Sequence, residues 1–297
     1  MMKAMLKRRI AERLAQYNRI VIWGAGSAGL LALGLLPRDR IIYAVDSFSS
    51  ARDLDGKPVE RPERLREEHP DTLVMIASIA DKEIGSWMDE NGVVCVRMDF
   101  YGLLVEVVDP ASMKDLLAAD LLANWHGSLV ETLIRRPQIL VNLSYRVSHS
   151  LLRSRSLPGR IAATLSRLWH ASNCAYFGID IPAEVSAGPG LVFAHCGAIV
   201  VHRRVTLGSF CTLYQGTTLG ANRRGAVPRL GGRVIVWAGA VVVGDCILGD
   251  RTEVGANSTV LGPFEVNHAI IAGTPARVLR QFSHPAAGEK AEDRNER

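Results

Sequence analysis

The sequence has few cysteines and no long apolar run, and both shortages narrow the class of protein. There are five cysteines, an odd number, and none belongs to a CxxC pair. They are Cys95, Cys174, Cys196, Cys211 and Cys246. This usage argues against a disulfide scaffold. It favours reduced thiols that fill small core positions in a cytoplasmic protein.

No apolar stretch of signal-peptide length follows the basic N-terminus. The most apolar window, Val21 to Leu36, is interrupted by four glycines and is too short to cross a bilayer. We therefore expect no membrane insertion.

An excess of one charge is also missing, because the net charge is only +5 and acids and bases are mixed along the chain. Such a balance is compatible with an anionic small ligand or with nucleic acid, and decides between neither. No segment combines aromatic and basic residues as a nucleic-acid module does, so we expect no nucleic-acid partner.

What the sequence does contain is a repeat of six residues between Val201 and Glu265. An aliphatic residue recurs at every sixth position and, after one interruption, resumes the same phase. The ten positions are Val201, Leu207, Leu213, Leu219, Leu230, Val236, Val242, Leu248, Val254 and Val260. The period predicts a solenoid of triangular coils, with one short strand per six residues and three strands per coil. An antiparallel meander would instead alternate with period two.

The stretch from Gly178 to Leu279 resembles the hexapeptide-repeat acyltransferases, in their serine acetyltransferase branch. The matching segments are Gly178-Ile-Asp-Ile-Pro-Ala183, the residues around His195, Gln215-Gly-Thr-Thr-Leu-Gly220 and Ala272-Gly-Thr-Pro-Ala-Arg-Val278. The resemblance implies a left-handed parallel β-helix over residues 178–282 and acetyl-CoA as co-substrate, with no metal. It also implies assembly into a homotrimer or a dimer of trimers.

Residues 1–105 predict an α/β domain with a glycine-rich turn. A strand over 19–23 runs into Gly24-Ala-Gly-Ser-Ala-Gly29, and the strand over 41–45 ends at Asp46. This is the GxGxxG order, in which backbone N–H groups at a helix N-terminus attract phosphate and an acid follows the next strand. Gly24, Gly26, Gly29 and Asp46 are therefore candidate residues for a nucleotide or acceptor site.

Further strands over 72–78 and 93–97 predict a parallel sheet of Rossmann type. A similar domain precedes the β-helix in bacterial sugar acetyltransferases, and that resemblance implies a role in holding a nucleotide-linked sugar. The alternative is a domain that keeps the fold and only docks on its neighbour.

Residues 106–177 predict helices, which the resemblance implies to be an assembly segment. Ser112 is expected to cap the first helix, Pro137 to break the second and Pro158-Gly159 to form a turn. The arginines are expected on solvated helix faces: Arg135, Arg136, Arg146, Arg153, Arg155 and Arg160. The polar tail, 283–297, is predicted to be disordered.

Acyl transfer from a thioester to a hydroxyl or amine needs a base that titrates near neutrality, as histidine does. The resemblance assigns this role to His195, with Asp180 orienting its imidazole. The two are 195 − 180 = 15 positions apart, which is not a whole coil of three six-residue strands. Their pairing therefore requires irregular first coils.

The resemblance also assigns coenzyme A contacts to Ala221, Ala238, Ala256 and Arg277, in a groove between two subunits. Small residues suit such a groove, because a bulky wall would block the pantetheine arm.

Three departures from the family concern the acceptor. Members carry an Asp before the base, where this chain has Ala194, and Arg-His before the proline of the inserted loop, where it has Ala226-Val227. In the family these charged side chains hold the amino acid, so their absence favours a different acceptor. The inserted loop itself is implied to overhang the active site.

We therefore predict acetyl-CoA-dependent transfer of an acetyl group to a hydroxyl or amine of a small acceptor, first of all a saccharide or nucleotide-linked sugar. Serine O-acetylation in cysteine biosynthesis is the alternative. From other classes, a γ-type carbonic anhydrase would need His195, His202 and His268 to converge. A non-catalytic scaffold would bind nucleotide through the glycine turn alone.

Overall fold

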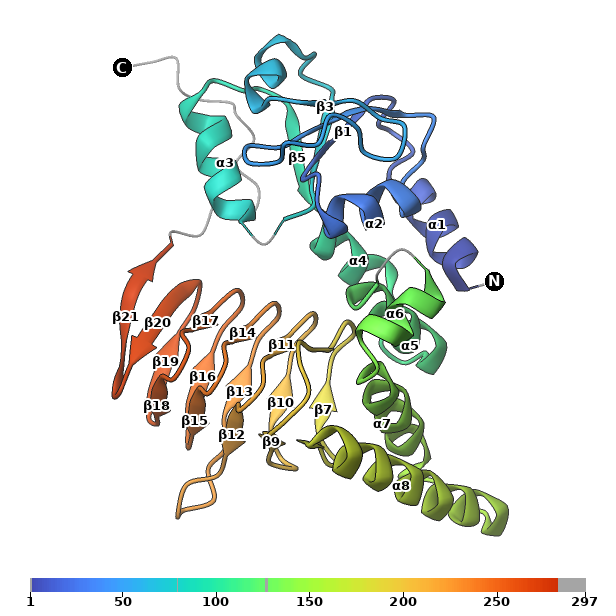
Figure 1. Cartoon of the computed structure of the whole chain (residues 1–297), viewed down its shortest axis with the longest axis vertical. Helices are drawn as coiled ribbons and strands as arrows, with labels where there is room; N and C mark the ends of the chain where they lie inside the picture. The colour runs from blue at the N-terminus through green and yellow to red at the C-terminus, as the bar shows by residue number, and fades with distance from the viewer. Residues whose placement is uncertain (1, 79, 126–127, 283–297) are drawn as a thin grey trace.

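The computed structural model describes residues 2–78, 80–125 and 128–282. The tail predicted to be disordered, 283–297, lies outside these described residues. An α/β unit, a group of helices and a coil of short strands follow one another along the chain (Figure 1). Within the described ranges, no helix has both the length and the apolar character needed to cross a membrane.

The N-terminal sheet consists of parallel strands in the order β3-β2-β1-β4-β5. The strands are β1 (Ile20–Trp23), β2 (Ile41–Val45), β3 (Val59–Glu60), β4 (Leu73–Ile76) and β5 (Val96–Asp99). The helices around them are α1 (Met2–Arg13), α2 (Ser27–Leu35), the 3-10 helix η1 (Pro62–Glu67), α3 (Asp81–Glu90) and α4 (Phe100–Val107). β1 and β4 are buried throughout, as central strands with helices on both faces should be. The α/β class predicted for this part is confirmed.

The helices of the middle segment are α5 (Met113–Ala123), α6 (Leu129–Arg135), α7 (Ile139–Leu151) and α8 (Leu157–Phe177). Ser112 caps α5 as predicted, because its hydroxyl accepts a hydrogen bond from the N–H of Asp115. The turn predicted at Pro158-Gly159 is wrong. These residues form the first turn of α8, where the missing proline N–H has no intrahelical partner to lose. Gly178 caps the C-terminus of α8 with a left-handed φ of 64°.

α4 and α5 also belong to the packing of the N-terminal unit. α4 runs through position 105, and Ala118, Ala119 and Leu122 of α5 share a buried cluster with residues of α1 and β1. The chain therefore leaves the α/β core only after α5.

From Ile179 the chain winds through three parallel sheets, named here after their first strands (Figure 1). The β6 sheet contains β6 (Ile179–Asp180), β9 (Ile199–Val201), β12 (Thr218–Gly220), β15 (Val241–Val243) and β18 (Thr259–Leu261). The β7 sheet contains β7 (Ser186–Ala187), β10 (Thr206–Leu207), β13 (Arg229–Leu230), β16 (Cys246–Leu248) and β19 (Phe264–Val266). The β8 sheet contains β8 (Val192–Phe193), β11 (Thr212–Leu213), β14 (Ile235–Val236), β17 (Glu253–Val254), β20 (Ala269–Gly273) and the antiparallel β21 (Ala276–Gln281).

All ten aliphatic residues of the six-residue repeat are buried in one continuous core. From β6 to β20, successive strands of the chain fall in different sheets, so three strands complete one coil. The predicted solenoid is confirmed, and its parallel sheets fit a left-handed β-helix.

The register shows where the coil departs from regularity. A regular coil takes 18 residues, since Val241 pairs with Thr259 and 259 − 241 = 18. The first coil is longer, because Asp180 pairs with Val200 and 200 − 180 = 20. A later coil takes 241 − 218 = 23 residues between Thr218 and Val241, because a loop follows β12. The irregular first coil expected from the sequence is confirmed.

The first coil has an open end, which the helices close. β6, β7 and β8 each pair with a strand on one side only, so backbone groups on the other side face away from the coil. Side chains of the helices and of the residues that flank them donate hydrogen bonds to these carbonyl oxygens, and we call these side chains the polar cap. The carbonyls are those of Ile181 (bound by His170), Ala183 (His149), Val185 (Tyr145), Ala187 and Gly188 (Arg146), Leu191 (Asn124 and Asn142), Phe193 (Gln138) and Ala194 (Gln138 and Arg136).

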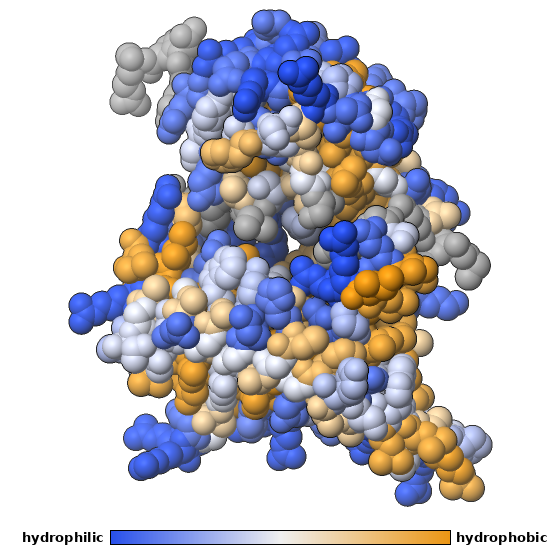
Figure 2. Space-filling model, in the orientation of Figure 1, coloured by the Kyte–Doolittle hydropathy of each residue, from blue (hydrophilic) through white to orange (hydrophobic). Residues whose placement is uncertain are grey.

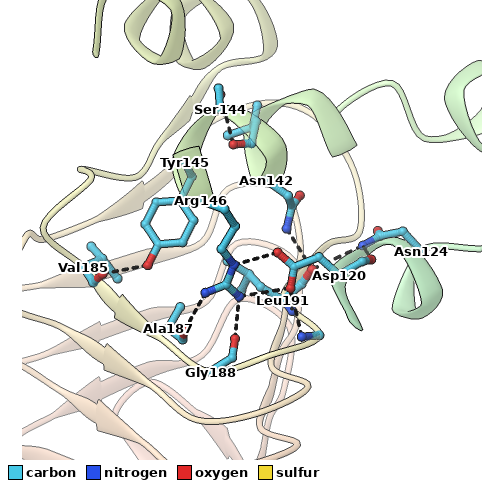
Figure 3. A network of polar contacts seen from close by, with 12 residues as sticks. Asp120, Asn124, Asn142, Ser144, Tyr145, Arg146, Val185, Ala187, Gly188 and Leu191 are labelled. Carbon is cyan, nitrogen blue, oxygen red and sulfur yellow. Dashed lines mark hydrogen bonds and ion pairs between the residues drawn. The ribbon is translucent and has the colours of Figure 1, made fainter. Parts of the chain in front are cut away.

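A buried ion pair stands at the centre of the polar cap (Figure 3). Arg146 donates through Nε and Nη2 to Asp120 at 2.9 and 3.0 Å, and neither side chain is more than 2% exposed. Asp120 also accepts from the N–H groups of Gly190 and Leu191. The predicted solvated position of Arg146 is therefore wrong, because its charge is matched inside the protein.

The α/β unit sits over the β8 sheet and is joined to it by charged side chains (Figure 1). Arg233 donates to Asp99 at 2.7 Å and lies 3.3 Å from Asp81. Arg251 contacts the same two carboxylates at 3.3 and 2.6 Å. Burial raises the pKa of Asp99, although Arg233 opposes that shift. Since Asp99 ends β5, the carboxyl edge of the N-terminal sheet faces the coil.

Candidate active site

His195 lies at the corner between β8 and β9 and is exposed. The two extra residues of the first coil fall at this corner. Val192 and Val200 are 200 − 192 = 8 apart, whereas their partners Thr212 and Thr218 are 218 − 212 = 6 apart. The insertion therefore makes the backbone at His195 different from every regular corner below it.

Asp180 lies in β6, beside Val200 of β9, and is also exposed. The corner that carries His195 stacks on the start of β6, because the N–H of Gly197 donates to the carbonyl of Phe177 at 2.9 Å. The structure thus brings the two predicted residues to the same end of the coil. No hydrogen bond or ion pair between their side chains is present in the described part of the chain. Their pairing stays a prediction.

Asp180 also borders a groove of about 620 Å³ between α8 and the first coil. His170 of α8 lines the same groove and is 5% exposed. Its Nε2 lies 2.7 Å from the carbonyl oxygen of Ile181, and its Nδ1 lies 3.0 Å from the hydroxyl of Ser144. Burial lowers the pKa of His170, although the Ile181 carbonyl and the carboxylates of Asp180 and Glu184 oppose the shift. The neutral ring therefore ties α8 and α7 to the strand that carries Asp180.

Two side chains of the polar cap hold the peptide next to His195. Gln138 donates through Nε2 to the carbonyls of Phe193 at 2.9 Å and of Ala194 at 3.3 Å, and Arg136 donates to the carbonyl of Ala194. The thiol of Cys196 lies 3.7 Å from the side-chain oxygen of Gln138. Gln138 is 3% exposed and so contacts the backbone before His195 and the side chain after it from inside the protein.

The corners that lead from the β8 sheet into the β6 sheet form one edge of the prism, at residues 194–198, 214–217, 237–240 and 255–258. We call it the histidine edge. Ala238 and Ala256 lie on this edge, below His195. Arg277 pairs with Ala272 in the hairpin at the end of the same sheet, and its side chain is exposed. Three of the predicted coenzyme A residues are therefore aligned below the candidate base.

Ala221 does not join this alignment within one chain. It follows β12 and so lies at a corner between the β6 and β7 sheets, on a different edge of the prism. The inserted loop begins there and projects below β12 (Figure 1). Asn222 closes the loop, because its side-chain oxygen accepts the N–H groups of Arg224 and Ala226. Within one chain the loop is thus separated from His195 by the width of the β6 sheet.

Packing explains why two of the three glycines in the turn of the N-terminal unit carry no side chain. A Cβ on Gly29 would lie 1.9 Å from the carbonyl oxygen of Gly24, and a Cβ on Gly24 would lie 2.6 Å from that of Ala77. A Cβ on Gly26 would meet nothing within 4 Å. Gly26 is thus the position in the motif that packing leaves unexplained.

The side chain of Asp46 contacts the backbone of the glycine turn. One carboxylate oxygen accepts the N–H of Ala25 at 2.8 Å, and the other accepts those of Phe48 and Ser49. Burial acts to raise the pKa of Asp46, but these backbone hydrogen bonds outweigh it and the net shift is downward. These hydrogen bonds therefore hold the loop after β2 in its present conformation.

The three histidines required by a carbonic anhydrase do not converge within one chain. His195 lies on the histidine edge, His202 follows β9 at the next edge, and His268 lies between β19 and β20 at the third. Among residues 2–78, 80–125 and 128–282, no group of three His, Cys, Asp or Glu side chains could hold a metal ion.

The cysteines are free, as predicted, and three of them fill core positions. Cys95, Cys211 and Cys246 are buried, and burial raises the pKa of Cys211 to about 12 and that of Cys246 to about 11. Cys196 is the exposed member, next to His195.

Sequence reasoning missed two sets of residues near His195. The polar cap was missed because its members lie on helices or at their ends, where neither period nor residue type distinguishes a buried polar residue from a solvated one. Tyr214 and Trp237 were missed although a signal exists, because each follows an inward aliphatic residue, Leu213 or Val236, of the same sheet. Aromatic residues at two equivalent corners are a local feature of the surface that is visible in the sequence.

The profile described as bacterial transferase hexapeptide (six repeats) matches residues 228–262. This match, the parallel sheets and the buried six-residue repeat define the chain as a hexapeptide-repeat transferase.

Comparison with known proteins narrows this class. The chain is similar to soybean serine acetyltransferase solved with serine, at 26% identity and a TM-score of 0.49, over 60% of this chain and 74% of that one. It is 31% identical over 155 residues to the serine acetyltransferase of Synechococcus elongatus, covering 50% of this chain and 60% of that protein. With the serine acetyltransferase of Helicobacter pylori strain J99 it shares 36% identity over 152 residues, which are 50% of this chain and 85% of that protein. On this last match, the chain belongs to the serine acetyltransferase family.

Proposed function

We propose that the protein is an acetyl-CoA-dependent acetyltransferase that uses His195 as its general base. The observation that carries the proposal is the histidine edge. It places an exposed imidazole at an irregular corner and aligns Ala238, Ala256 and Arg277 below it. Small residues leave room for the pantetheine arm, and Arg277 offers a positive charge to a phosphate of coenzyme A.

The chemistry follows from this placement. The imidazole of His195 takes the proton of the acceptor hydroxyl as its oxygen attacks the thioester carbonyl. Backbone N–H groups of the corners stabilise the oxyanion that forms, and collapse of this intermediate expels the thiolate of coenzyme A, which recovers the proton. Asp180, at the same end of the coil, favours the imidazolium during the transfer.

L-serine is the first acceptor to test, because the relatives that establish the family are serine acetyltransferases. Serine O-acetylation is therefore our proposed reaction. A saccharide hydroxyl is the second candidate. It is supported by the uncharged residues Ala194, Ala226 and Val227, which offer nothing to bind the ammonium and carboxylate of an amino acid.

The donor groove is proposed to form between two copies of the chain. Ala221 lies on a different edge from Ala238 and Ala256, so one chain alone does not gather the predicted contacts. Orange patches lie over α6 and α8 in Figure 2. The exposed aliphatic side chains of these helices are Leu129, Val130, Leu133, Ile134, Leu157, Ile161, Leu165 and Leu168. These faces suit assembly contacts, and we propose a homotrimer or a dimer of trimers.

The organisation proposed for the chain is a Rossmann-like domain over residues 1–105, a helical assembly segment over 106–177, whose first helix α5 packs on that domain, and a left-handed β-helix over 178–282. The strand order of the N-terminal sheet supports the first of these, because β1 lies between β2 and β4 as in doubly wound sheets. Gly24, Gly26, Gly29 and Asp46 remain a proposed ligand site, with Gly26 the member left open by packing.

The test is His195→Ala, assayed by release of the coenzyme A thiol from acetyl-CoA in the presence of serine. General-base loss should lower kcat by about 10²- to 10⁴-fold. His202→Ala is the matched control, because His202 lies on another edge and should change kcat less than about twofold. Equal activity in wild type and His195→Ala would reject the proposed base.

A further inference from the structure

An aromatic pair stands on the histidine edge beside His195. Tyr214 and Trp237 occupy equivalent corners of successive coils, and their rings stack with centroids 4.5 Å apart and an interplanar angle of 29°. The imidazole of His195 and the ring of Tyr214 are inclined by 60°, with centroids 5.9 Å apart. One face of Tyr214 is therefore occupied by Trp237, and the imidazole lies against the remaining side of the ring. We call Tyr214 and Trp237 the aromatic brace.

The aromatic brace is attached to a rigid part of the coil. The aliphatic residue before each ring points into the core and is fully buried. The N–H of Tyr214 donates to the carbonyl of Val236 at 3.0 Å, as a regular bond between successive coils. The indole N–H of Trp237 donates to Glu253 at 3.2 Å, and this bond fixes the orientation of the indole. Both rings are thus held by the β8 sheet rather than by the corner that carries His195.

His195, by contrast, stands on an irregular corner. This corner has two residues more than its equivalent in the next coil, and the side chain of His195 is exposed. Among the described residues, the imidazole makes no hydrogen bond or ion pair, and its one ring contact is with Tyr214. An exposed side chain rotates among several rotamers, and each alternative rotamer lowers the fraction of molecules in which the base is in place. Within one chain, the contact with Tyr214 is therefore what selects an orientation of the imidazole.

We propose that Tyr214 is a positioning residue for His195 and is itself supported by Trp237. This inference rests on the proposed function, in which His195 is the base. The polar cap holds the backbone of the corner through Gln138, and the aromatic brace holds the ring from the coil. Two inclined rings attract each other, because the positive edge of one meets the negative face of the other. An aromatic ring also attracts a cation within about 6 Å of its centroid, so the contact persists when the imidazole takes the proton of the acceptor.

The ring of Tyr214, rather than its hydroxyl, has this role. Within the described ranges, the hydroxyl of Tyr214 makes no hydrogen bond, so phenylalanine should replace the tyrosine. Trp237 acts one step further away, because its ring contacts Tyr214 and not the imidazole. Loss of activity should therefore be largest without the ring of Tyr214, smaller without the ring of Trp237 and smallest without the hydroxyl alone.

The experiment measures thiol release from acetyl-CoA by wild type, Tyr214→Leu, Trp237→Leu and Tyr214→Phe, with serine, glucosamine and galactose as acceptors. Loss of one ring contact corresponds to about a 3- to 10-fold change in rate. Tyr214→Leu should lower kcat by this factor and leave the KM for acetyl-CoA within about twofold, Trp237→Leu should lower kcat less, and Tyr214→Phe should stay within about twofold of wild type. Tyr17→Leu is the matched control, because Tyr17 is a half-buried tyrosine of the α/β unit without a contact to His195.

A double-mutant cycle separates positioning from a merely structural role. In the His195→Ala background, adding Tyr214→Leu should change kcat by less than about twofold, because no imidazole remains to be positioned. A loss of folded protein would instead act equally in both backgrounds. If Tyr214→Leu does not fold, Tyr214→Met takes its place, since methionine keeps bulk without a ring and adapts to irregular space.

Three results would overturn the inference while leaving the proposed function intact: a kcat of Tyr214→Leu equal to that of wild type, a loss in Tyr214→Phe as large as in Tyr214→Leu, or the same factor of loss with and without His195. A raised KM for acetyl-CoA at unchanged kcat would assign Tyr214 to the donor and would overturn it as well. If His195→Ala equals wild type, the proposed function fails first, and this inference fails with it.

Discussion

Replacing Gln138 by leucine should separate the positioning of His195 from the stability of the coil. Gln138 has no hydrogen bond to the imidazole among the described residues, yet its amide holds the carbonyls of Phe193 and Ala194. Leucine has a similar volume and cannot donate a hydrogen bond. The change therefore removes the anchor of the corner without opening a large cavity.

The size of the effect follows from which partners remain. The carbonyl of Ala194 keeps its bond from Arg136, but Phe193 loses its side-chain donor in a site where Gln138 is 3% exposed. One buried carbonyl left without that donor costs about 1–3 kcal/mol of unfolding free energy. A corner that relaxes by about 1 Å can reduce catalysis by about 10²-fold. We expect kcat to fall by about 10- to 100-fold while the KM for acetyl-CoA stays within about twofold.

Asn142→Leu is the matched control, because it makes the same amide-to-leucine change elsewhere in the polar cap. Asn142 donates to the carbonyl of Leu191, which also receives a bond from Asn124 at 3.2 Å. This variant should lose at most about 1 kcal/mol and keep kcat near wild type. Steady-state kinetics with acetyl-CoA and the best acceptor, together with urea unfolding, measure both quantities.

The reasoning is refuted if Gln138→Leu keeps the kcat of wild type, or if both variants lose activity in proportion to their loss of stability. In either case the polar cap would only close the coil and would not position the imidazole.

Two further predictions concern His170 and Arg233, which connect the coil to its neighbouring parts. Burial lowers the pKa of His170 below its unfolded value, so the neutral ring contributes stability that is fully present above the unfolded pKa and is lost as pH falls below it. Wild type should lose up to about 1.4 kcal/mol per pH unit on acidification from pH 7 to 5, and melting curves of His170→Gln over the same range should lack that component. Arg233→Met removes a cation that is 14% exposed between Asp81 and Asp99 and should cost about 2–4 kcal/mol, seen as faster hydrogen exchange in α3 and α4. Arg229→Met, whose exposed bond to Asp245 is 3.6 Å long, should show neither change.

The coil could be predicted from the sequence because its signal is repeated. Each inward position, such as Val236 or Val254, recurs at the same interval, and a bulky polar residue at any of them would break the core. The interval also located the inserted loop, since an interruption of phase is visible without any contact being known. An irregular first coil could be expected from the sequence, but the position of its two extra residues at His195 could not, because no residue type marks a longer corner.

The side chains that bind the backbone and carboxylates around the site could not be predicted. They are distant in sequence from their partners, and only the packing of the folded chain brings them together. Gln138 and Phe193 are 55 positions apart, and Arg233 and Asp99 are 134 apart. In the sequence, Arg146 lies in a predicted helix just as the exposed arginines near it do. Its burial is possible because Asp120, on the neighbouring helix, pairs with its charge. Such choices depend on how α7 packs on the first coil, which no local pattern encodes.

A solenoid of parallel strands must close its first coil, since unpaired N–H and C=O groups would otherwise lie buried or invite another chain. In this chain the closing side chains also set the corner that carries His195, because Gln138 and Arg136 bind the two carbonyls just before it. The α/β unit is fixed to the coil beside the same β8 sheet by Arg233 and Arg251. The corner that carries the imidazole is therefore held from the helical side, while the α/β unit is fixed to the β8 sheet that leads into this corner. It follows that substitutions at Gln138 or Arg136 should alter catalysis at His195 through the backbone of its corner.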